Sequence, residues 1–220
     1  MKVLEPRMRQ CHWDAYQGCT FQHYVKFGPP AKDRPTLELV LRHYKGNEVA
    51  FSLPDAESGR EKVVNFDLDW VHEHTGFPID GEIIYNNRDP YPRLWVEYFH
   101  KRFTRKGKKS AKNMRRYVEE LLQSLVESRK KKDIEDFVLL QILYQCSLMW
   151  CPSSVQGIPR LLFKYVDSIE RVRNVAWGKY IYDQTKKGIK IAREGLHRSG
   201  ISYVPGCMPL IPVSWINLCM

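Results

Sequence analysis

The sequence lacks an apolar leader and lacks a clean membrane-spanning run. Met1 is followed by charged residues at positions 2, 5, 7 and 9, so the chain does not open as a signal peptide does. Residues 137–159 and 199–220 carry no charge, but glutamines and prolines interrupt the first stretch and three prolines the second. Neither stretch is a run of about 20 apolar residues, so we expect no membrane span. The six cysteines are therefore expected to be free thiols in a reducing compartment.

The common catalytic and metal-binding motifs are also missing. There is no G-x-S-x-G elbow, and Gly178-Lys179 lacks the earlier glycine of a phosphate-binding loop. Four residues of zinc-ligand type have a C-x7-C-x3-H spacing that matches no common structural site: Cys11, His12, Cys19 and His23. We interpret them as core or surface residues, with a metal site as the alternative. We expect no enzymatic activity and no catalytic, cofactor-binding or metal-binding residues.

The composition is that of a globular protein. In 220 residues, 43% are hydrophobic and 27% are charged, which is enough apolar material for one domain with a sizeable core. The net charge of +10 is distributed unevenly. Residues 1–100 hold 12 basic and 15 acidic residues, whereas residues 101–132 hold 13 basic and three acidic ones. This pattern indicates one localised basic element on a nearly neutral scaffold.

The basic element consists of two clusters. Nine basic residues without an acid lie between 101 and 116, and four more follow at 129–132. Such clusters bind phosphate by charge alone and are typical of nuclear-import signals, whereas the alternative is a solvated loop and helix face. We predict nuclear import or nucleic-acid contact at Lys101, Arg102, Arg105, Lys106, Lys108, Lys109, Lys112, Arg115, Arg116, Arg129, Lys130, Lys131 and Lys132.

Turn signals divide the first 90 residues into short pieces. We expect a helix over 36–44 and a small hairpin that pairs 48–53 with 62–66. A helical turn over 67–75 should end at Gly76, which suits the left-handed position after a helix.

The second half of the chain is more clearly helical. Apolar residues three and four apart predict an amphipathic helix over 114–126. A central apolar helix should begin near Asp133 as its cap and run to about Trp150. Further helices are expected over 161–172 and from Asn174 onward. The predicted class is mainly α, a helical domain with a small N-terminal β-hairpin element.

We divide the chain into an N-terminal extension, residues 1–35, and a helical domain, residues 36–220. The sequence stops on the apolar segment Trp215–Met220 without a polar tail. This ending is unusual for a complete domain and predicts a truncation at the C-terminus.

Several segments together resemble the plant mobile domain family, often labelled aminotransferase-like plant mobile domain. The likeness extends over about residues 36–218 and rests on turn and packing residues, such as Thr75-Gly76 before Pro78 and Trp177-Gly178. The segments that carry it are Phe66–Glu82, Val138–Trp150, Tyr165–Ile169, Asn174–Gly178, and Tyr203–Cys207 followed by Trp215-Ile216. Two departures are the basic insertion at 101–116 and the absence of the residues that usually follow the last tryptophan.

The resemblance implies a nuclear protein of transposable-element origin, because host copies of that family act in genome stability, silencing and meristem maintenance. It transfers no catalytic residue, and the family label does not imply transamination, which needs a Schiff-base lysine in a cofactor fold. The expected partners are nucleic acid, through residues 101–132, and nuclear proteins, with neither a membrane nor a small-molecule substrate. The alternative is a protein-interaction module normally fused to a ubiquitin-like protease, as in a related plant transposon domain.

Overall fold

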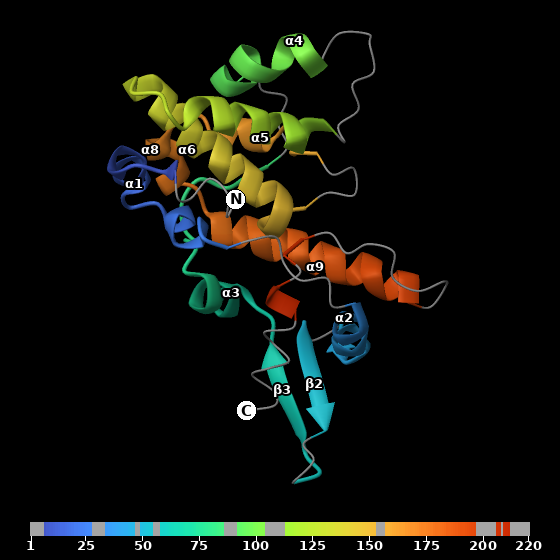
Figure 1. The fold of residues 1–220 in the computed structure, drawn as a ribbon. Coiled ribbons are helices and arrows are strands. Elements are labelled where there is room, and N and C mark those ends of the chain that lie inside the picture. Colours follow the sequence, from blue (N-terminus) through green and yellow to red (C-terminus); the bar gives the residue numbers. More distant parts are fainter. Residues whose placement is uncertain are drawn as a thin grey trace. The chain divides into compact units, whose positions relative to one another are not determined.

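The computed structural model describes residues 7–27, 34–46, 49–54, 58–85, 92–103, 113–152, 157–196, 206–207 and 209–211. The chain folds as two compact units. Unit 1 comprises Met1–Pro29, Asp80–Leu148 and Pro152–Val175, and unit 2 comprises Pro30–Ile79, Met149–Cys151 and Ala176–Met220. The predicted class is confirmed, because the fold is mainly helical with a small antiparallel sheet (Figure 1).

Helix α6, Lys131–Gln145, is the centre of unit 1. Every residue from Asp136 to Gln145 is buried, so this helix is covered on all sides, as its nearly uniform apolar sequence predicts. The π-helical turn η5, Cys146–Trp150, continues it to the predicted end. The amphipathic helix α5, Met114–Leu125, packs against α6 through Met114, Val118 and Leu122.

Helix α1, Gln10–Tyr16, also packs on α6. The buried Tyr16 hydroxyl donates to Gln141 Oε1 at 2.9 Å, and the centroid of the His12 ring lies 4.6 Å from that of the Phe137 ring. This part of the expected N-terminal extension therefore contributes to a core. The boundary predicted after residue 35 falls within α2, Arg34–Arg42, of unit 2.

Short helical elements complete unit 1. An aromatic cluster joins two of them, since Phe99 lies 4.8 Å from Phe163 and 5.8 Å from Trp95 between ring centroids. The elements are the 3-10 turn η2 (Thr20–Tyr24), the π-helical turn η3 (Trp95–Phe99), α4 (His100–Phe103), α7 (Leu162–Tyr165) and α8 (Ile169–Arg173).

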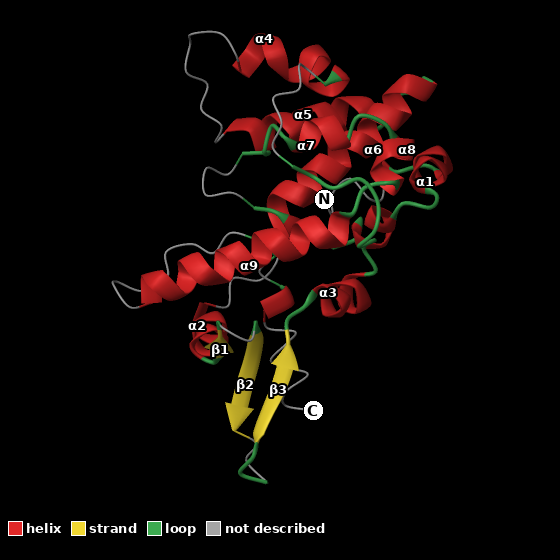
Figure 2. Cartoon of the chain, turned by 180° about the vertical axis from the view of Figure 1, so that it is seen from behind, coloured by secondary structure: helices red, strands yellow, loops and turns green. Residues whose placement is uncertain are grey.

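The predicted hairpin is confirmed in unit 2. Strand β2, Ala50–Pro54, pairs antiparallel with β3, Glu61–Asn65, with Phe51 opposite Val64 (Figure 2). A third strand that the sequence did not indicate, β1 at Tyr44–Lys45, adds to the other edge of β2. The helix expected to reach Tyr44 therefore ends at Arg42. Tyr44 is buried against Phe51, with 5.1 Å between the ring centroids.

Helices α3, Leu68–Thr75, and α9, Trp177–Leu196, pack together in unit 2. Asp67 caps α3 by accepting from Trp70 N at 2.8 Å, and Gly76 ends it with a φ of 62°, as predicted. Gly178 allows the start of α9 to approach the segment after α3 closely. A Cβ at this position would lie 2.9 Å from the Phe77 carbonyl oxygen, and Gly178 N donates to Pro78 O at 2.8 Å.

Three details of the helix predictions were wrong. Asp133 does not cap α6, whose N-cap is Lys130, because the Asp133 carboxylate instead accepts a hydrogen bond from Ser128. The helix expected over 161–172 is broken into α7 and α8, since the Ser168 hydroxyl caps a new helix by accepting from Arg171 N at 3.2 Å. The last helix begins at Trp177 rather than Asn174.

Candidate nucleic-acid interface

The predicted basic element separates into three groups. Arg105, Lys106, Lys108, Lys109 and Lys112 lie outside the described residues. Among the other eight, four are engaged in contacts within unit 1 and four are exposed without an acidic partner in the described part of the chain. The engaged residues are Arg102, Arg115, Arg116 and Lys132, and the remaining four are Lys101, Arg129, Lys130 and Lys131.

Arg102 and Arg116 share Glu120. The Arg116 guanidinium lies 3.3 Å from that carboxylate and the Arg102 guanidinium lies 3.8 Å from it. Arg102 also lies over the Tyr117 ring, 4.1 Å from the centroid, which connects α4 to α5. These contacts neutralise part of the charge that the sequence assigned to a binding surface.

Arg115 has a different structural role. Its half-buried guanidinium donates to the carbonyl oxygen of Ser147, at the start of the π-helical turn η5. The carbonyls at the end of a regular helix lack partners within it, and a cation stabilises that negative end. Arg115 therefore joins α5 to the end of α6.

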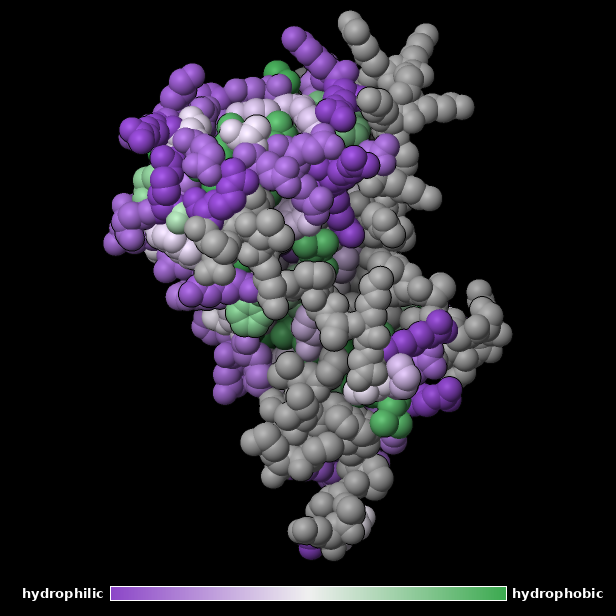
Figure 3. Space-filling view, in the orientation of Figure 1, coloured by the Kyte–Doolittle hydropathy of each residue, from purple (hydrophilic) through white to green (hydrophobic). Residues whose placement is uncertain are grey.

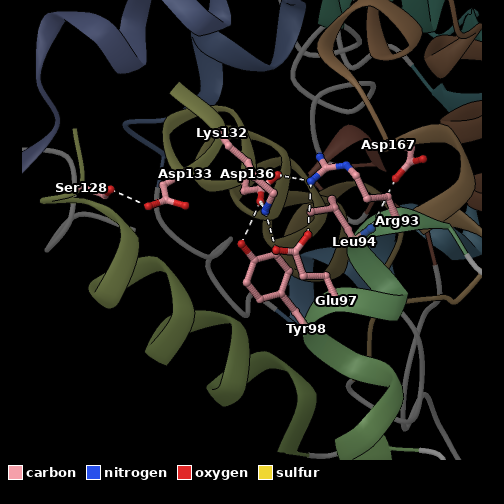
Figure 4. Close-up of polar contacts among 9 residues, drawn as sticks. All are labelled: Arg93, Leu94, Glu97, Tyr98, Ser128, Lys132, Asp133, Asp136 and Asp167. Carbon is pink, nitrogen blue, oxygen red and sulfur yellow. Dashed lines mark hydrogen bonds and ion pairs between the residues drawn. The ribbon is translucent and has the colours of Figure 1, made fainter. Parts of the chain in front are cut away.

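Lys132 belongs to a network around the buried Asp136 (Figure 4). Asp136 Oδ2 accepts from Lys132 Nζ and from the Tyr98 hydroxyl, both at 2.8 Å, and Arg93 Nη1 lies 2.6 Å from Oδ1. Lys132 Nζ also donates to Glu97. Both oxygens of a fully buried carboxylate are thus paired, as a stable buried charge requires.

The network holds Asp136 and Lys132 in their charged states. Burial by itself raises the pKa of Asp136, but hydrogen bonds from Lys132, Tyr98 and Arg93, together with the charge of Arg93, outweigh burial and lower it. Hydrogen bonds to Asp136 and Glu97 raise the pKa of Lys132. The network therefore connects the segment 93–98 to α6, and Lys132 is a structural residue.

Arg129 and Lys130 lie in the turn between α5 and α6, and Lys131 is the first residue of α6; we name these three residues the basic turn. All three side chains are exposed. Figure 3 shows hydrophilic side chains over α5 and α6, the two helices that this turn connects. The residues lie at the start of α6, where backbone N–H groups make the helix end positive and cations are unfavourable. The three cations therefore lie where positive charge does not stabilise the helix.

Acids next to the basic turn already have partners. Glu127 accepts from Arg7 at 3.0 Å, and Asp133 accepts from the Ser128 hydroxyl at 2.5 Å. Arg9 Nη2 donates to the carbonyl oxygens of Val126 and Ser128, which fixes the backbone of the turn. The arrangement leaves the three cations free for an anion in solution and positions them on an anchored turn.

The residues of zinc-ligand type are not gathered into a ligand cluster in the described part of the chain. No group of three or more His, Cys, Asp or Glu side chains in the described ranges is arranged to hold a metal ion. His12 is buried, and its Nδ1 accepts from Arg9 N at 3.0 Å. Burial raises the pKa of Cys19 to about 11, so its thiol is protonated and unreactive. The five described cysteines carry free thiols, as expected.

No helix within the described ranges is long and apolar enough to span a membrane. The central helix α6 is apolar, yet it is 15 residues long and contains the charged Asp136.

A second basic surface lies on α9 and was not recognised in the sequence. A hollow of about 710 Å³ in unit 2 is lined by cations of this helix together with Tyr44 and Gly46. We name it the α9 pocket; its basic residues are Lys186, Lys187, Lys190 and Arg193. The spacing of four cations within eight residues was visible in the sequence. The acidic residues Asp183 and Glu194 in the same helix lower its net charge, so a count of net charge along the chain does not reveal this basic cluster.

Comparison with known proteins assigns the chain to a family by sequence. The family model described as Domain of unknown function (DUF8566) matches residues 40–211, which is well over half of the chain. The chain belongs to the DUF8566 family. No curated protein and no solved structure matches it. The DUF8566 match includes the basic turn and the α9 pocket, whereas α1 precedes it.

Proposed function

We propose that this protein is a non-enzymatic nuclear domain of transposable-element origin that acts through non-specific nucleic-acid contacts or protein contacts. The resemblance to plant mobile domain proteins motivates the origin and the nuclear roles in genome stability, silencing and meristem maintenance. The observation that carries the nucleic-acid contact is the basic turn, where Arg129, Lys130 and Lys131 are exposed and make no ion pair with a described acid.

The proposed contact is with the phosphate backbone. Lysine and arginine side chains on an exposed turn reach phosphates without entering a groove, so they provide affinity without reading the base sequence. Binding of this kind releases counterions and therefore weakens steeply as the salt concentration rises. The same exposed cations can be read by the nuclear-import machinery, together with the cluster at 101–116.

The test is a salt titration of binding to random-sequence duplex DNA. The double variant Lys130→Gln/Lys131→Gln should reduce the magnitude of the slope of log K against log salt by about 1.8, because each lost phosphate contact contributes about 0.9. The control, Arg102→Gln/Arg116→Gln, also removes two charges but takes them from residues paired with Glu120. Its slope should change by much less.

Binding that does not depend on salt, or equal effects of the two double variants, would contradict the contact at the basic turn. A chain that binds no DNA but retains a specific protein partner after charge neutralisation would favour the alternative, a protein-interaction module normally fused to a ubiquitin-like protease. A fluorescent fusion that stays out of the nucleus would contradict the proposed localisation.

A further inference from the structure

The α9 pocket differs from the basic turn in shape. It is a concave hollow of about 710 Å³, within the range of roughly 300–1,000 Å³ that is usual for small-ligand sites. The lining residues that the structure describes come from α9 and from the segment that holds Tyr44 and Gly46, and all of these belong to unit 2. A small ligand can enter such a hollow, whereas a rod-shaped duplex meets the surface around it.

The charge of the lining favours an anion. Four cations face two carboxylates, Asp183 and Glu194, and Asp183 is already paired with Lys179 at 2.7 Å. Lys187 and Lys190 are exposed and make no ion pair with a described acid. Within the described residues, the polar contact of Lys186 is with the neutral Tyr182, whose hydroxyl lies 3.4 Å from its Nζ. The pocket thus holds more positive charge than its own carboxylates compensate.

The spacing of the cations favours more than one anionic group. Lys186, Lys190 and Arg193 are four and three residues apart, which places them along one face of the helix. The seven residues from the first to the last span about 10 Å at 1.5 Å per residue. A row of this length exceeds a single phosphate and suits a molecule with two or more phosphate groups.

Two residues outside α9 position the arginine. The Arg193 guanidinium lies over the Tyr44 ring, 5.6 Å from its centroid. Gly46 leaves room for this group, because a Cβ at position 46 would lie 2.9 Å from Arg193 Nη1. Tyr44 is itself fixed by burial against Phe51. An arginine held in this way can bind a phosphate with two parallel hydrogen bonds, which a lysine cannot do.

We infer that the α9 pocket binds a small organic polyphosphate, with Lys186, Lys190 and Arg193 as its main phosphate ligands. Inositol polyphosphates and nucleoside polyphosphates share the required chemistry. The site is separate from the basic turn of unit 1 and does not depend on the proposed nucleic-acid contact. We assign it as a ligand site rather than a catalytic one.

The test is isothermal titration calorimetry of the full chain with inositol hexakisphosphate, with adenosine triphosphate and with inorganic phosphate. We expect one organic polyphosphate per chain and much weaker binding of inorganic phosphate. Lys186→Gln/Lys190→Gln should weaken polyphosphate binding at least tenfold. Arg193→Lys, which keeps the charge but loses the paired hydrogen bonds, should weaken it about threefold to tenfold.

The control is the basic-turn variant Lys130→Gln/Lys131→Gln, which should bind the polyphosphate as the unmodified chain does. Circular dichroism of each variant establishes that it is folded. Failure of both organic polyphosphates to bind, or an equal loss in the control, would overturn the assignment. Binding of random-sequence DNA that is lost in Lys186→Gln/Lys190→Gln while neither polyphosphate binds would assign the pocket to nucleic acid instead.

The experiments can contradict the assignment of one site while supporting that of the other. If only the basic turn is misassigned, DNA binding is unaffected by Lys130→Gln/Lys131→Gln while polyphosphate binding persists. If only the α9 pocket is misassigned, the DNA salt slope behaves as proposed and the calorimetric titrations with polyphosphate show no binding.

Discussion

Unit 1 and unit 2 place their basic residues in different electrostatic settings. In unit 1, Arg93 and Lys132 pair with a buried carboxylate, and Arg115 binds the carbonyl end of a helix. In unit 2, the cations of α9 surround a solvent-facing hollow. The same residue types therefore stabilise unit 1 at these positions, whereas they remain available for ligands on α9 and at the basic turn. A count of positive charge along the chain does not make this distinction.

The two units also close their cores differently. Unit 1 relies on a paired charge, since Asp136 is fully buried among three donors. Unit 2 relies on glycines that let backbone segments meet. A Cβ at Gly206 would lie 2.5 Å from Thr185 Cα, and the next residue, Cys207, donates its N–H to Thr185 Oγ1 at 2.9 Å. In unit 1, the most damaging substitution should therefore be one that removes the buried charge. In unit 2, it should be one that adds a side-chain atom where two backbone segments meet.

The largest effect is expected from Asp136→Asn. Asparagine removes the buried negative charge that accepts from Lys132 and Tyr98 and pairs with Arg93, so the loss of these charge-assisted contacts should cost about 3–4 kcal/mol of unfolding free energy at pH 7. The measurement is urea unfolding followed by circular dichroism. The control is Asp133→Asn on the same helix, which loses a single hydrogen bond with Ser128 and should cost about 1 kcal/mol. Equal costs would contradict a special role for the buried network.

The same variant should alter the pH dependence of stability. The folded pKa of Asp136 lies below its unfolded value, so its contribution is complete above the unfolded pKa of about 3.9. That contribution is lost as the pH falls through the lower folded pKa. Stability of the unmodified chain should therefore fall more steeply below pH 4 than stability of Asp136→Asn. Parallel curves would contradict the pairing of the folded carboxylate.

The next effect tests unit 2. Gly206→Ala should cost about 3 kcal/mol, because the φ of 91° is unfavourable for alanine and the new Cβ would meet the backbone of α9. Gly59→Ala is the matched control, since Gly59 has a φ of 65° but no atom within 4 Å of an added Cβ. It should cost about 1 kcal/mol from conformation alone. Unfolding free energies from urea titration measure both.

The smallest effects come from two neighbours on α5. Arg115→Gln should cost about 1–2 kcal/mol, because the buried Ser147 carbonyl loses the hydrogen bond that the half-buried Arg115 guanidinium donates to it. Arg116→Gln should change stability by less than about 0.5 kcal/mol, because its pair with Glu120 is exposed. Similar losses from the two variants, measured by the same titration, would indicate that the engaged cations of unit 1 do not differ in role.

Local chemistry was enough to predict several elements. The apolar spacing from Met114 gave α5, and the uncharged stretch after residue 136 gave α6 with its π-helical continuation. Gly76 marked the end of α3. These features depend on residues within a few positions of one another, so their physical causes lie in the sequence itself.

Other elements were mispredicted because a competing contact overrides the preference that the residue pattern indicated. Tyr44 has the spacing to continue α2, yet pairing with Phe51 places it in a strand. Asp133 has the side chain of a helix cap, but Ser128 binds its carboxylate. Residues 161–172 have helical periodicity, and the hydroxyl of Ser168 nevertheless starts a new helix. In each case a hydrogen bond or strand pair competes with a local preference and is stronger.

By itself, the sequence determined that this protein is mainly helical, where its principal helices lie and that its charge is concentrated. Hydrophobic periodicity, turn residues and charge counts are local properties of a chain. Only the tertiary structure decided which cations pair with anions or carbonyls of the same chain and which remain exposed without an ion pair among the described residues. That decision depends on buried carboxylates and carbonyls brought from residues far away, such as Asp136 for Arg93, and on the hollow that α9 shares with Gly46.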